Sequence, residues 1–388
     1  MLPYAVCGPI LVPLGVLWKA CACPFVALGR TTGAISMPTL PDTDMSGRVV
    51  IVTGANTGIG NRAALHLARM GAKVIMACRS VERGEEARAK MEKEIRESAM
   101  AVAGNTETDV SSGHGSGTTK SGTLDVMQCD LGDLKSVRAF ARAFEEKHGG
   151  QLDVLVNNAG LGGPVNNEAS ALTTDGIDVV FGVNFVGHFA LTMELMPLIQ
   201  STQAARVVCL SSVMHHFGCT EWEGAVGGHR GRIGKSTYCD SKLAMVLFAK
   251  ELRRKFNAAG STATAFSVNP GAVRSDIWRF VPKLVMPVYD FCMRLLFLNV
   301  EEGCHTTVCT SSLPLESLSV SDYYQPYWLP FGWQFPFEIL GVFAGSKPAQ
   351  PSLPKDEPTV SAALWTSCER IIEAAKAARG GGVSTQRG

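Results

Sequence analysis

The amino-acid sequence predicts an α/β fold in which one doubly wound parallel sheet carries helices on both faces. Three observations lead to this prediction. Short apolar runs rich in β-branched residues alternate with longer segments of helical spacing. A glycine-rich turn follows the first apolar run at once. Small or polar residues follow several of the other runs, at the strand ends where such sheets bind their ligands.

Length and composition limit the classes of protein. With 388 residues the chain can hold one large α/β domain or two smaller ones. Lys and Arg total 36 and Asp and Glu total 35, so a net charge of +1 gives no electrostatic case for a nucleic-acid partner. The 12 cysteines form no Cys-x-x-Cys pair and no cluster with zinc-ligand spacing. We therefore expect free thiols in a reducing compartment and no metal site.

Residues 1–30 differ from the rest of the chain, because they are apolar and their first charged residue is Lys19. A helix that spans a membrane needs about 20 apolar residues, so this segment is a candidate anchor. Prolines at positions 3, 9, 13 and 24 weaken a straight helix. A cleaved signal peptide and a leader packed on the domain are the alternatives. Residues 31–47 are interpreted as a linker.

The first strand is predicted over residues 49–53 and leads directly into a glycine-rich loop and a helix. Glycine lets the backbone turn tightly and approach a pyrophosphate, whose charge the N-terminus of the next helix favours. This context favours a dinucleotide site over an ordinary strand-to-helix turn. The candidate cofactor-binding residues are Gly54, Asn56, Thr57, Gly58, Ile59 and Gly60.

The second strand, predicted over 73–77, indicates which cofactor is preferred. Enzymes that prefer NAD place a carboxylate near this strand end, whereas a basic residue can pair with a 2′-phosphate. Arg79, with no acid beside it, therefore favours NADP(H); an exposed arginine at a helix start is the alternative. A charged helix is predicted from Val81 to about Glu97. Residues 98–123, rich in Gly, Ser and Thr, are predicted to form a disordered insertion.

The third and fourth strands are predicted over 123–129 and 152–156, with a helix over 134–148 between them. Asp130, after the third strand, either caps the next turn or accepts a hydrogen bond from the adenine amino group. Small residues after the fourth strand let the backbone lie against a cofactor, and the asparagines there are expected to tie neighbouring strands together. The candidates at this position are Asn157, Ala159 and Gly160.

A long helix is predicted over 175–200. It contains Asn184, which is unfavourable inside an apolar helix unless its side chain is hydrogen-bonded. The fifth strand is predicted over 206–211, with Ser212 just beyond its end. The long connection over 213–237 is expected to shape one wall of a pocket. A metal site at its two adjacent histidines is a weak alternative, because further ligands are missing.

Tyr238 and Lys242 lie four residues apart at the start of a helix predicted to reach about Asn257, so their side chains share one face. A nearby ammonium favours the phenolate and lowers the pKa of the tyrosine. The pair is predicted to exchange a proton with a carbonyl that receives hydride. After a sixth strand over 264–268, the backbone turns and is predicted to reach the nicotinamide. The candidates there are Pro270, Gly271 and Ser275.

The remaining chain is bulky and partly aromatic. Residues 276–298 are expected to form either core or a lid over an apolar substrate. The aromatic run over 323–343 is expected to carry the last strand and then to cover the pocket or dock on lipid. A helix over 359–378 completes one domain spanning 48–378, and residues 379–388 are expected to form a flexible tail.

Four motifs, in this order, make residues 46–312 similar to the short-chain dehydrogenase/reductase family. They are the glycine loop, Asn157-Asn158-Ala159-Gly160, Tyr238 with Lys242, and Asn269-Pro270-Gly271. Further strings are similar to the retinol dehydrogenase-like branch of that family: Ala77-Cys78-Arg79-Ser80, Asn184 with Gly187-His188-Phe189, Ser241-Lys242-Leu243-Ala244 and Glu301-Glu302-Gly303. The branch prefers NADP(H) and acts on retinoids and other lipophilic alcohols and carbonyls. An N-terminal apolar segment often holds its members at the endoplasmic reticulum.

The resemblance implies roles for four residues. Tyr238 is the general acid and base, and Lys242 lowers its pKa and bonds the nicotinamide ribose. Ser212 orients the carbonyl; it is preferred to Ser211 because the family's serine closes that short string. Asn184 holds a water in the proton relay. The insertion over 98–123 and the aromatic run over 323–343 have no counterpart in the branch.

The sequence thus predicts an NADP(H)-dependent oxidoreductase that transfers hydride between nicotinamide and a lipophilic alcohol or carbonyl, such as a retinoid, a fatty aldehyde or a sterol. The rival from another class is a catalytically inactive, nucleotide-sensing module of the same fold. The resemblance also implies membrane association at the endoplasmic reticulum, with a cytoplasmic protein as the alternative. The helix from Tyr238 is a homodimer surface in many relatives, but the sequence leaves substrate, reaction direction and oligomeric state open.

Overall fold

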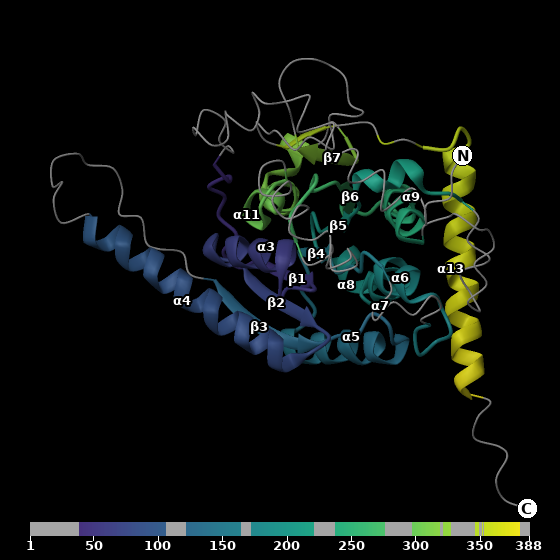
Figure 1. The fold of residues 1–388 in the computed structure, drawn as a ribbon, viewed down its shortest axis with the longest axis horizontal. Helices are drawn as coiled ribbons and strands as arrows, with labels where there is room; N and C mark the ends of the chain where they lie inside the picture. Colours follow the sequence, from purple (N-terminus) through teal and green to yellow (C-terminus); the bar gives the residue numbers. More distant parts are fainter. Residues whose placement is uncertain are drawn as a thin grey trace, which may run out of the picture.

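A computed structural model describes residues 39–105, 122–163, 172–220, 237–275, 297–318, 321–326, 346–348, 351 and 353–380. These residues form an eight-stranded sheet in the order β3-β2-β1-β4-β5-β6-β7-β8 (Figure 1). The first seven strands pair in parallel, and β8 is antiparallel to β7. The order reverses direction between β1 and β4, which is where a doubly wound sheet binds its ligand. The predicted fold class is confirmed.

The strands lie close to their predicted positions. They are β1 (Val49–Thr53), β2 (Lys73–Cys78), β3 (Thr123–Gln128), β4 (Val154–Asn157), β5 (Arg206–Leu210), β6 (Thr264–Val268), β7 (Tyr323–Pro326) and β8 (Ser346–Pro348). Every residue of β1 and β4 is buried, because helices cover both faces of the sheet. The last parallel strand, β7, begins the aromatic run as predicted, and residues 327–345 lie outside the described ranges.

Two layers of helices enclose the sheet (Figure 1). A cluster of buried apolar side chains lies under each layer. One layer holds α3 (Gly58–Arg69), α4 (Val81–Asn105), α11 (Val300–Gly303), α12 (His305–Ser312) and the turn η7 (Leu315–Leu318). The other holds α5 (Leu134–His148), α6 (Val179–Phe181), the π-helical turn η3 (Gly182–Val186), α7 (Gly187–Glu194), α8 (Met196–Ser201) and α9 (Thr237–Ala258). The short helix η4 (Val213–Phe217) connects β5 toward α9.

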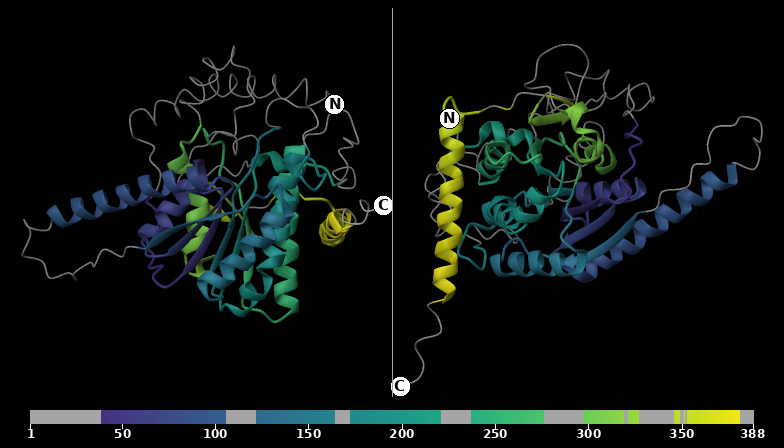
Figure 2. Two further views of the ribbon diagram at one scale, coloured as in Figure 1. Left: turned by 90° about the horizontal axis from the view of Figure 1, so that it is seen from below. Right: turned by 180° about the vertical axis from the view of Figure 1, so that it is seen from behind.

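The C-terminal helix α13 (Glu357–Gly380) packs along the outside of α9 (Figure 2). The ring of Trp365 meets the ring of Phe189 edge-on, with 5.0 Å between the centroids, and the ammonium of Lys255 lies 4.4 Å from the Trp365 ring centre. Arg254 and Glu357 form an ion pair of 3.0 Å across the two helices. The helix predicted over 359–378 is therefore confirmed with slightly wider bounds, and it belongs to the main apolar core.

The charged helix after β2 is longer than the sequence predicted. α4 continues to Asn105, so residues 98–105 are helical and do not begin a disordered insertion. The physical reason is the composition of 99–103, in which alanine and methionine dominate and favour helix. In Figure 1 this part of α4 extends away from the sheet. Thr123 already belongs to β3, and residues 106–121 lie outside the described ranges.

The single helix predicted over 175–200 is also wrong in detail. Residues 175–178 form a turn and a bridge, and Asp178 caps the helix by accepting bonds from Val180 and Phe181. The helix then widens into the π turn η3 and stops at Leu195. Pro197, which has no backbone N–H to donate, lies in the first turn of the separate helix α8.

Among the described residues, no helix is long and apolar enough to cross a membrane. The candidate anchor over 1–30 lies outside them, as does most of the apolar segment over 276–298.

Candidate active site

The glycine loop between β1 and α3 has the backbone shape that its sequence predicted. Gly54 and Gly58 have φ angles of +66° and +63°, a region that residues with a Cβ rarely adopt. A Cβ at Gly60 would lie 2.2 Å from the side-chain nitrogen of Asn158. Glycine is therefore required at all three positions, and the N-terminus of α3 is presented at the carboxyl edge of the sheet.

The end of β4 closes one side of this loop. A Cβ at Gly54 would lie 3.0 Å from the Cβ of Ala159. The Thr53 hydroxyl oxygen accepts the backbone N–H groups of Asn158 and Ala159 at 2.9 and 3.0 Å. The Asn158 amide donates to the Thr53 carbonyl at 2.7 Å, so an asparagine ties β1 to β4 as predicted. Thr53 and Asn158 were not among the predicted site residues, although Thr53 ends the first predicted strand and Asn158 belongs to the motif Asn157-Asn158-Ala159-Gly160.

The predicted cofactor-binding residues after β1 and β2 have different surroundings. Arg79 is exposed directly after β2, which pairs with β1. Thr57 is exposed and Asn56 is half-buried in the loop. The side chain of Ile59 instead packs against Val273 and Leu298 and so anchors the loop to apolar residues.

Asp130 and Asn157 have partners within the protein. One carboxylate oxygen of Asp130 accepts the N–H of Gly132 at 2.9 Å, which is the turn-capping role considered for it. Asn157 is fully buried, and its amide donates to Thr192 at 3.0 Å, so its side chain points into the core. The prediction that Asn157 contacts the cofactor therefore gains no support from its side chain.

The turn after β6 approaches the glycine loop from the other side. Gly271 has a φ of +80°, and its N–H donates to the side chain of Asn269 at 3.0 Å. Pro270 is buried. The Cβ of Ser275 lies 4.0 Å from where a Cβ of Gly58 would be, so Ser275 faces the loop.

Lys242 is a buried cation at the centre of the site. Its side-chain nitrogen donates to the Leu210 carbonyl at 3.0 Å and lies 5.6 Å from the centre of the Tyr238 ring. Burial lowers the pKa of Lys242 from 10.5 to about 8. The ammonium and the phenol thus share one helix face as predicted, at the carboxyl end of β5.

Asn184 lies beside Lys242 in the π turn η3. A Cβ at Gly160 would lie 3.4 Å from the Asn184 side-chain oxygen and 3.5 Å from the Lys242 nitrogen, so both groups flank Gly160. The Asn184 amide donates to the Leu161 carbonyl and to the Ser241 hydroxyl, at 3.0 and 3.1 Å. Both amide hydrogens are used, which explains how an asparagine is tolerated in this apolar helix. Its side-chain oxygen accepts the N–H of Leu161 at 2.7 Å, which leaves one lone pair on that oxygen for a further donor.

The two serines after β5 have different surroundings. Ser211 is buried and its hydroxyl donates to the Lys242 carbonyl at 2.8 Å. Ser212 is half-buried and caps η4 by accepting the N–H of Met214 at 3.2 Å. Ser211 therefore fixes the helix that carries Tyr238, and Ser212 is the serine with an accessible side chain, consistent with the choice made from the sequence.

These residues suit a nicotinamide dinucleotide. The loop offers glycine backbone and a helix N-terminus to a pyrophosphate, and Tyr238 and Lys242 lie two strands further along the same edge of the sheet.

Among the described residues, no group of three or more His, Cys, Asp or Glu side chains could hold a metal ion. His215 of the adjacent pair donates to the Ser212 carbonyl at 2.7 Å.

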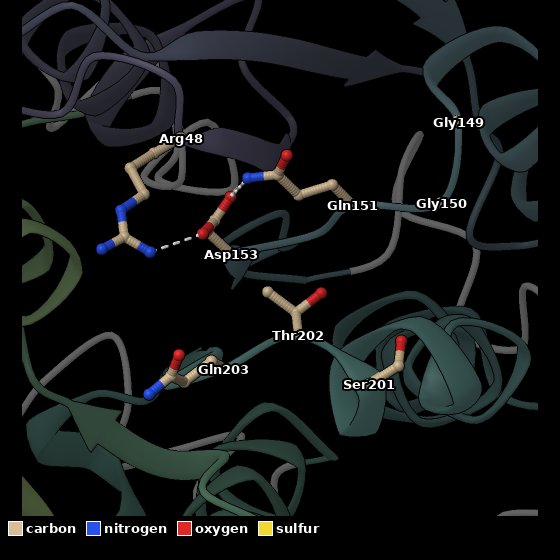
Figure 3. A pocket seen from close by; sticks show the side chains of 8 residues that line it. All are labelled: Arg48, Gly149, Gly150, Gln151, Asp153, Ser201, Thr202 and Gln203. Carbon is tan, nitrogen blue, oxygen red and sulfur yellow. Dashed lines mark hydrogen bonds and ion pairs between the residues drawn. The ribbon is translucent and has the colours of Figure 1, made fainter.

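A hollow of about 420 Å³ lies at the opposite edge of the sheet, at the amino ends of β1 and β4 (Figure 3). Arg48 pairs with Asp153 at 2.8 Å, and the other carboxylate oxygen accepts from Gln151 and from the N–H of Val49. Both oxygens of Asp153 thus join the starts of β1 and β4. The hollow contains none of the predicted site residues, so we assign it no part in the chemistry.

Comparison with known proteins identifies the family of the chain. A family model described as short chain dehydrogenase matches residues 48–112 and 114–283. Retinol dehydrogenase 11 of Homo sapiens is 40% identical over 253 residues, which cover 65% of this chain and 66% of that protein. Retinol dehydrogenase 12 of Bos taurus is 34% identical over 314 residues, 78% of this chain and 89% of that protein.

Solved structures show the same fold. A crystal structure of a protein from Mycobacterium Paratuberculosis is 30% identical, with a TM-score of 0.58 and coverage of 86% of this chain and 96% of that one. L-sorbose reductase from Gluconobacter frateurii, complexed with NADPH and L-sorbose, is 18% identical, with a TM-score of 0.51 and coverage of 70% and 92%.

Lys242→Met tests the cost of the buried cation. Because the folded pKa of Lys242 is about 8 and the ordinary value is 10.5, burial of the charge costs about 3 kcal/mol below pH 8. The substitution removes this cost, but it also removes the hydrogen bond to the Leu210 carbonyl, which offsets about 1–3 kcal/mol of the gain in stability. We expect urea unfolding at pH 7 to give Lys242→Met a free energy of unfolding equal to the wild type or up to ~2 kcal/mol higher.

This difference should shrink between pH 8 and 10.5, as the wild-type ammonium loses its proton and the burial penalty is relieved. Lys90→Met, at an exposed position of α4, is the control and should change little at either pH. A variant less stable than the wild type by several kcal/mol at pH 7 would contradict the buried, destabilised ammonium.

Proposed function

The chain belongs to the short-chain dehydrogenase family, and from this premise we propose that it is an NADP(H)-dependent oxidoreductase acting on lipophilic alcohols and carbonyls. One observation supports this proposal most strongly. The buried Lys242 ammonium, the Tyr238 ring and the half-buried Ser212 lie at the same sheet edge as the glycine loop. A sensor that only binds nucleotide would not need a destabilised cation beside a phenol.

The proposed mechanism assigns one task to each of these residues. A bound nicotinamide would supply or accept the hydride. Tyr238 gives its phenolic proton to the carbonyl oxygen in reduction and takes it back in oxidation. Lys242, 5.6 Å from the ring centre, favours the phenolate and thereby lowers the pKa of Tyr238. The Ser212 hydroxyl donates to the substrate oxygen and orients it.

Two positions flank the reacting groups. A side chain at position 160 would approach Lys242 and Asn184. Because Gly160 has none, the space beside these two residues stays open for the cofactor. The side-chain oxygen of Asn184 accepts the N–H of Leu161 and has one further lone pair beside Lys242, which suits the water of a proton relay.

The preference for NADP(H) rests on Arg79. Its side chain is exposed at the end of β2, beside the strand that carries the glycine loop. Neither neighbour, Cys78 or Ser80, is acidic, so a 2′-phosphate would meet a cation there and no carboxylate. Two proteins of the same fold, 19% and 18% identical to this chain, have been solved with NADP or NADPH.

The substrate class and the membrane association rest on the relatives and on the N-terminus. The names of the curated relatives point to retinol-like substrates, and the bulky residues over 276–298 suit an apolar substrate. The apolar residues 1–30 would hold the enzyme at a membrane, most simply that of the endoplasmic reticulum.

Tyr238→Phe tests the mechanism, because it removes the proton and keeps the ring. Purified protein would be given NADPH with all-trans-retinal, a long-chain aldehyde or a 3-oxosteroid, and NADPH consumption would be followed. We expect wild-type turnover with at least one of them and a loss of at least ~10²-fold in kcat for the variant. NADPH affinity, measured separately by fluorescence, should change little. Unchanged turnover in the variant would rule out this proton donor, and NADPH binding without wild-type turnover would favour the sensor.

Arg79→Asp tests the cofactor preference. A carboxylate repels the 2′-phosphate and can bond a ribose 2′-hydroxyl, so KM should rise for NADPH and rise less or fall for NADH. Arg96→Asp, an exposed change far along α4, controls for net charge. An unaltered ratio of the two KM values would show that Arg79 does not read the 2′-phosphate.

Deletion of residues 1–30 tests the anchor. The full chain should sediment with membranes and resist extraction by high salt, whereas the shortened chain should stay in the supernatant. A shortened chain that still sediments would place membrane binding elsewhere in the protein.

A further inference from the structure

A buried histidine that the mechanism does not use links the glycine loop to the acid–base pair. His188 lies in the first turn of α7 and is completely buried. Its Nε2 lies 2.9 Å from the Thr53 hydroxyl oxygen, and its Nδ1 lies 3.0 Å from the Asn184 backbone carbonyl. The imidazole therefore joins the end of β1 to the π turn beside Lys242.

The pattern of hydrogen bonds fixes the tautomer of His188. A carbonyl can only accept, so Nδ1 carries a hydrogen and donates it to Asn184. The Thr53 oxygen already accepts two N–H groups, from Asn158 and Ala159, which fill both of its lone pairs. Its own hydrogen must therefore go to an acceptor, and two are within reach: Nε2 at 2.9 Å and the Val156 carbonyl at 3.3 Å. Nε2 is the nearer of the two, and it is free to accept because the hydrogen of the ring is on Nδ1. His188 is neutral, with its hydrogen on Nδ1.

The burial of the His188 ring also favours the neutral form. Desolvation, with a smaller contribution from the Lys242 ammonium, lowers the pKa of His188 from 6.5 to about 4, although the hydrogen bond to Asn184 opposes the shift. A doubly protonated ring would direct an N–H at a hydroxyl oxygen that has no lone pair left. The neutral form is therefore maintained at physiological pH by both the bonds and the burial.

The chain of bonds continues from Asn184 to the catalytic helix. The Asn184 amide donates to the Ser241 hydroxyl at 3.1 Å, and this hydroxyl donates to the Tyr238 carbonyl at 2.7 Å. Asn184 and Ser241 are completely buried. These hydrogen bonds link the backbone at the end of β4 to the backbone of Tyr238 through Thr53, His188, Asn184 and Ser241. At Asn184 the link passes from its backbone carbonyl to its side-chain amide.

We propose that His188 is a positioning residue: its Nδ1–H fixes the Asn184 turn against Lys242 and Tyr238, and the Thr53 hydroxyl selects the tautomer that makes this possible. The proposal rests on the proposed function, because it assigns a role in that reaction. An imidazole is unusual in this apolar helix, where a leucine would fill the space without any polar group to satisfy. Its value lies in having a donor and an acceptor on opposite sides of one rigid ring.

Two substitutions separate the two halves of the ring. His188→Asn places an amide N–H near the position of Nδ1, so it keeps the donor to Asn184 and loses the contact with Thr53. His188→Gln reaches toward Thr53 and loses the donor to Asn184. Both variants are neutral and polar and both remove the ring, so general damage to packing should affect them alike.

The measurements are kcat and KM for the best carbonyl substrate with NADPH from pH 5.5 to 9.5, NADPH affinity and thermal stability. We expect His188→Gln to lower kcat about tenfold, the effect of one lost bond to the positioned carbonyl, with NADPH affinity within about twofold. We expect its pH profile to shift by roughly half a unit, because Asn184 no longer holds its place beside Lys242. His188→Asn should keep kcat within about threefold and the wild-type pH profile.

Equal losses of kcat in the two variants, or wild-type kcat and pH profile in both, would overturn the proposal. A larger loss in His188→Asn would do the same. These outcomes differ from failure of the proposed function, which would show as a wild-type protein that binds NADPH and turns over no substrate.

A second measurement does not depend on turnover. Long-range ¹H–¹⁵N correlation spectra of histidine-labelled wild type would identify His188 by the signal lost in His188→Asn. The signal should show the Nδ1–H tautomer and should not titrate between pH 5.5 and 8. An Nε2–H tautomer, or a titration in that range, would overturn the assignment of the hydrogen bonds.

Discussion

The active site depends most directly on the hydrogen bonds that the Thr53 hydroxyl oxygen accepts. It lies where β1 and β4 end side by side, and it accepts two backbone N–H groups of the Asn-Asn-Ala-Gly turn. Loops of parallel strands meet at one edge of the sheet, but nothing in strand pairing alone fixes their mutual distance. The Thr53 bonds fix it, and the narrow gap that results is why Gly54 and Gly60 tolerate no side chain.

A second constraint comes from placing a cation in the protein interior. Lys242 has one hydrogen-bond acceptor from the chain, the Leu210 carbonyl, and it lacks a carboxylate partner among the residues described here. In the proposed mechanism this cost has a purpose, because the ammonium lowers the pKa of the Tyr238 phenol. The site is therefore less stable than an apolar core would be, which is common where groups are held ready for chemistry.

The outer helix α13 bears on how the enzyme assembles. Trp365 and its neighbours bury one side of α9, the helix that carries Tyr238 and Lys242. The resemblance named this helix as a dimer surface in many relatives, and a homodimer stays a prediction for this chain. Any such dimer would have to use a surface of α9 that α13 does not cover, or use α13 itself.

The sequence by itself determined the fold class, the succession of strands and helices along the chain, the glycine loop and the Tyr238–Lys242 pair. These follow from local patterns: runs of β-branched residues, glycines that the backbone requires, and spacing along a helix. It did not determine that α4 continues to Asn105 or that the helix around Asn184 contains a π turn. Helix ends and irregular turns depend on packing and on bonds to distant residues, which no local pattern contains.

Only the tertiary structure decided the partners of the polar residues. Asn157 and Asn158 are adjacent and chemically identical, yet one points into the core toward Thr192 and the other ties β4 to β1. His188 was visible in the sequence as part of a motif, but its two partners lie 135 and 4 residues away. Side chains alternate between the faces of a strand, so a one-residue difference reverses the environment, and contacts between distant segments form only when the sheet assembles.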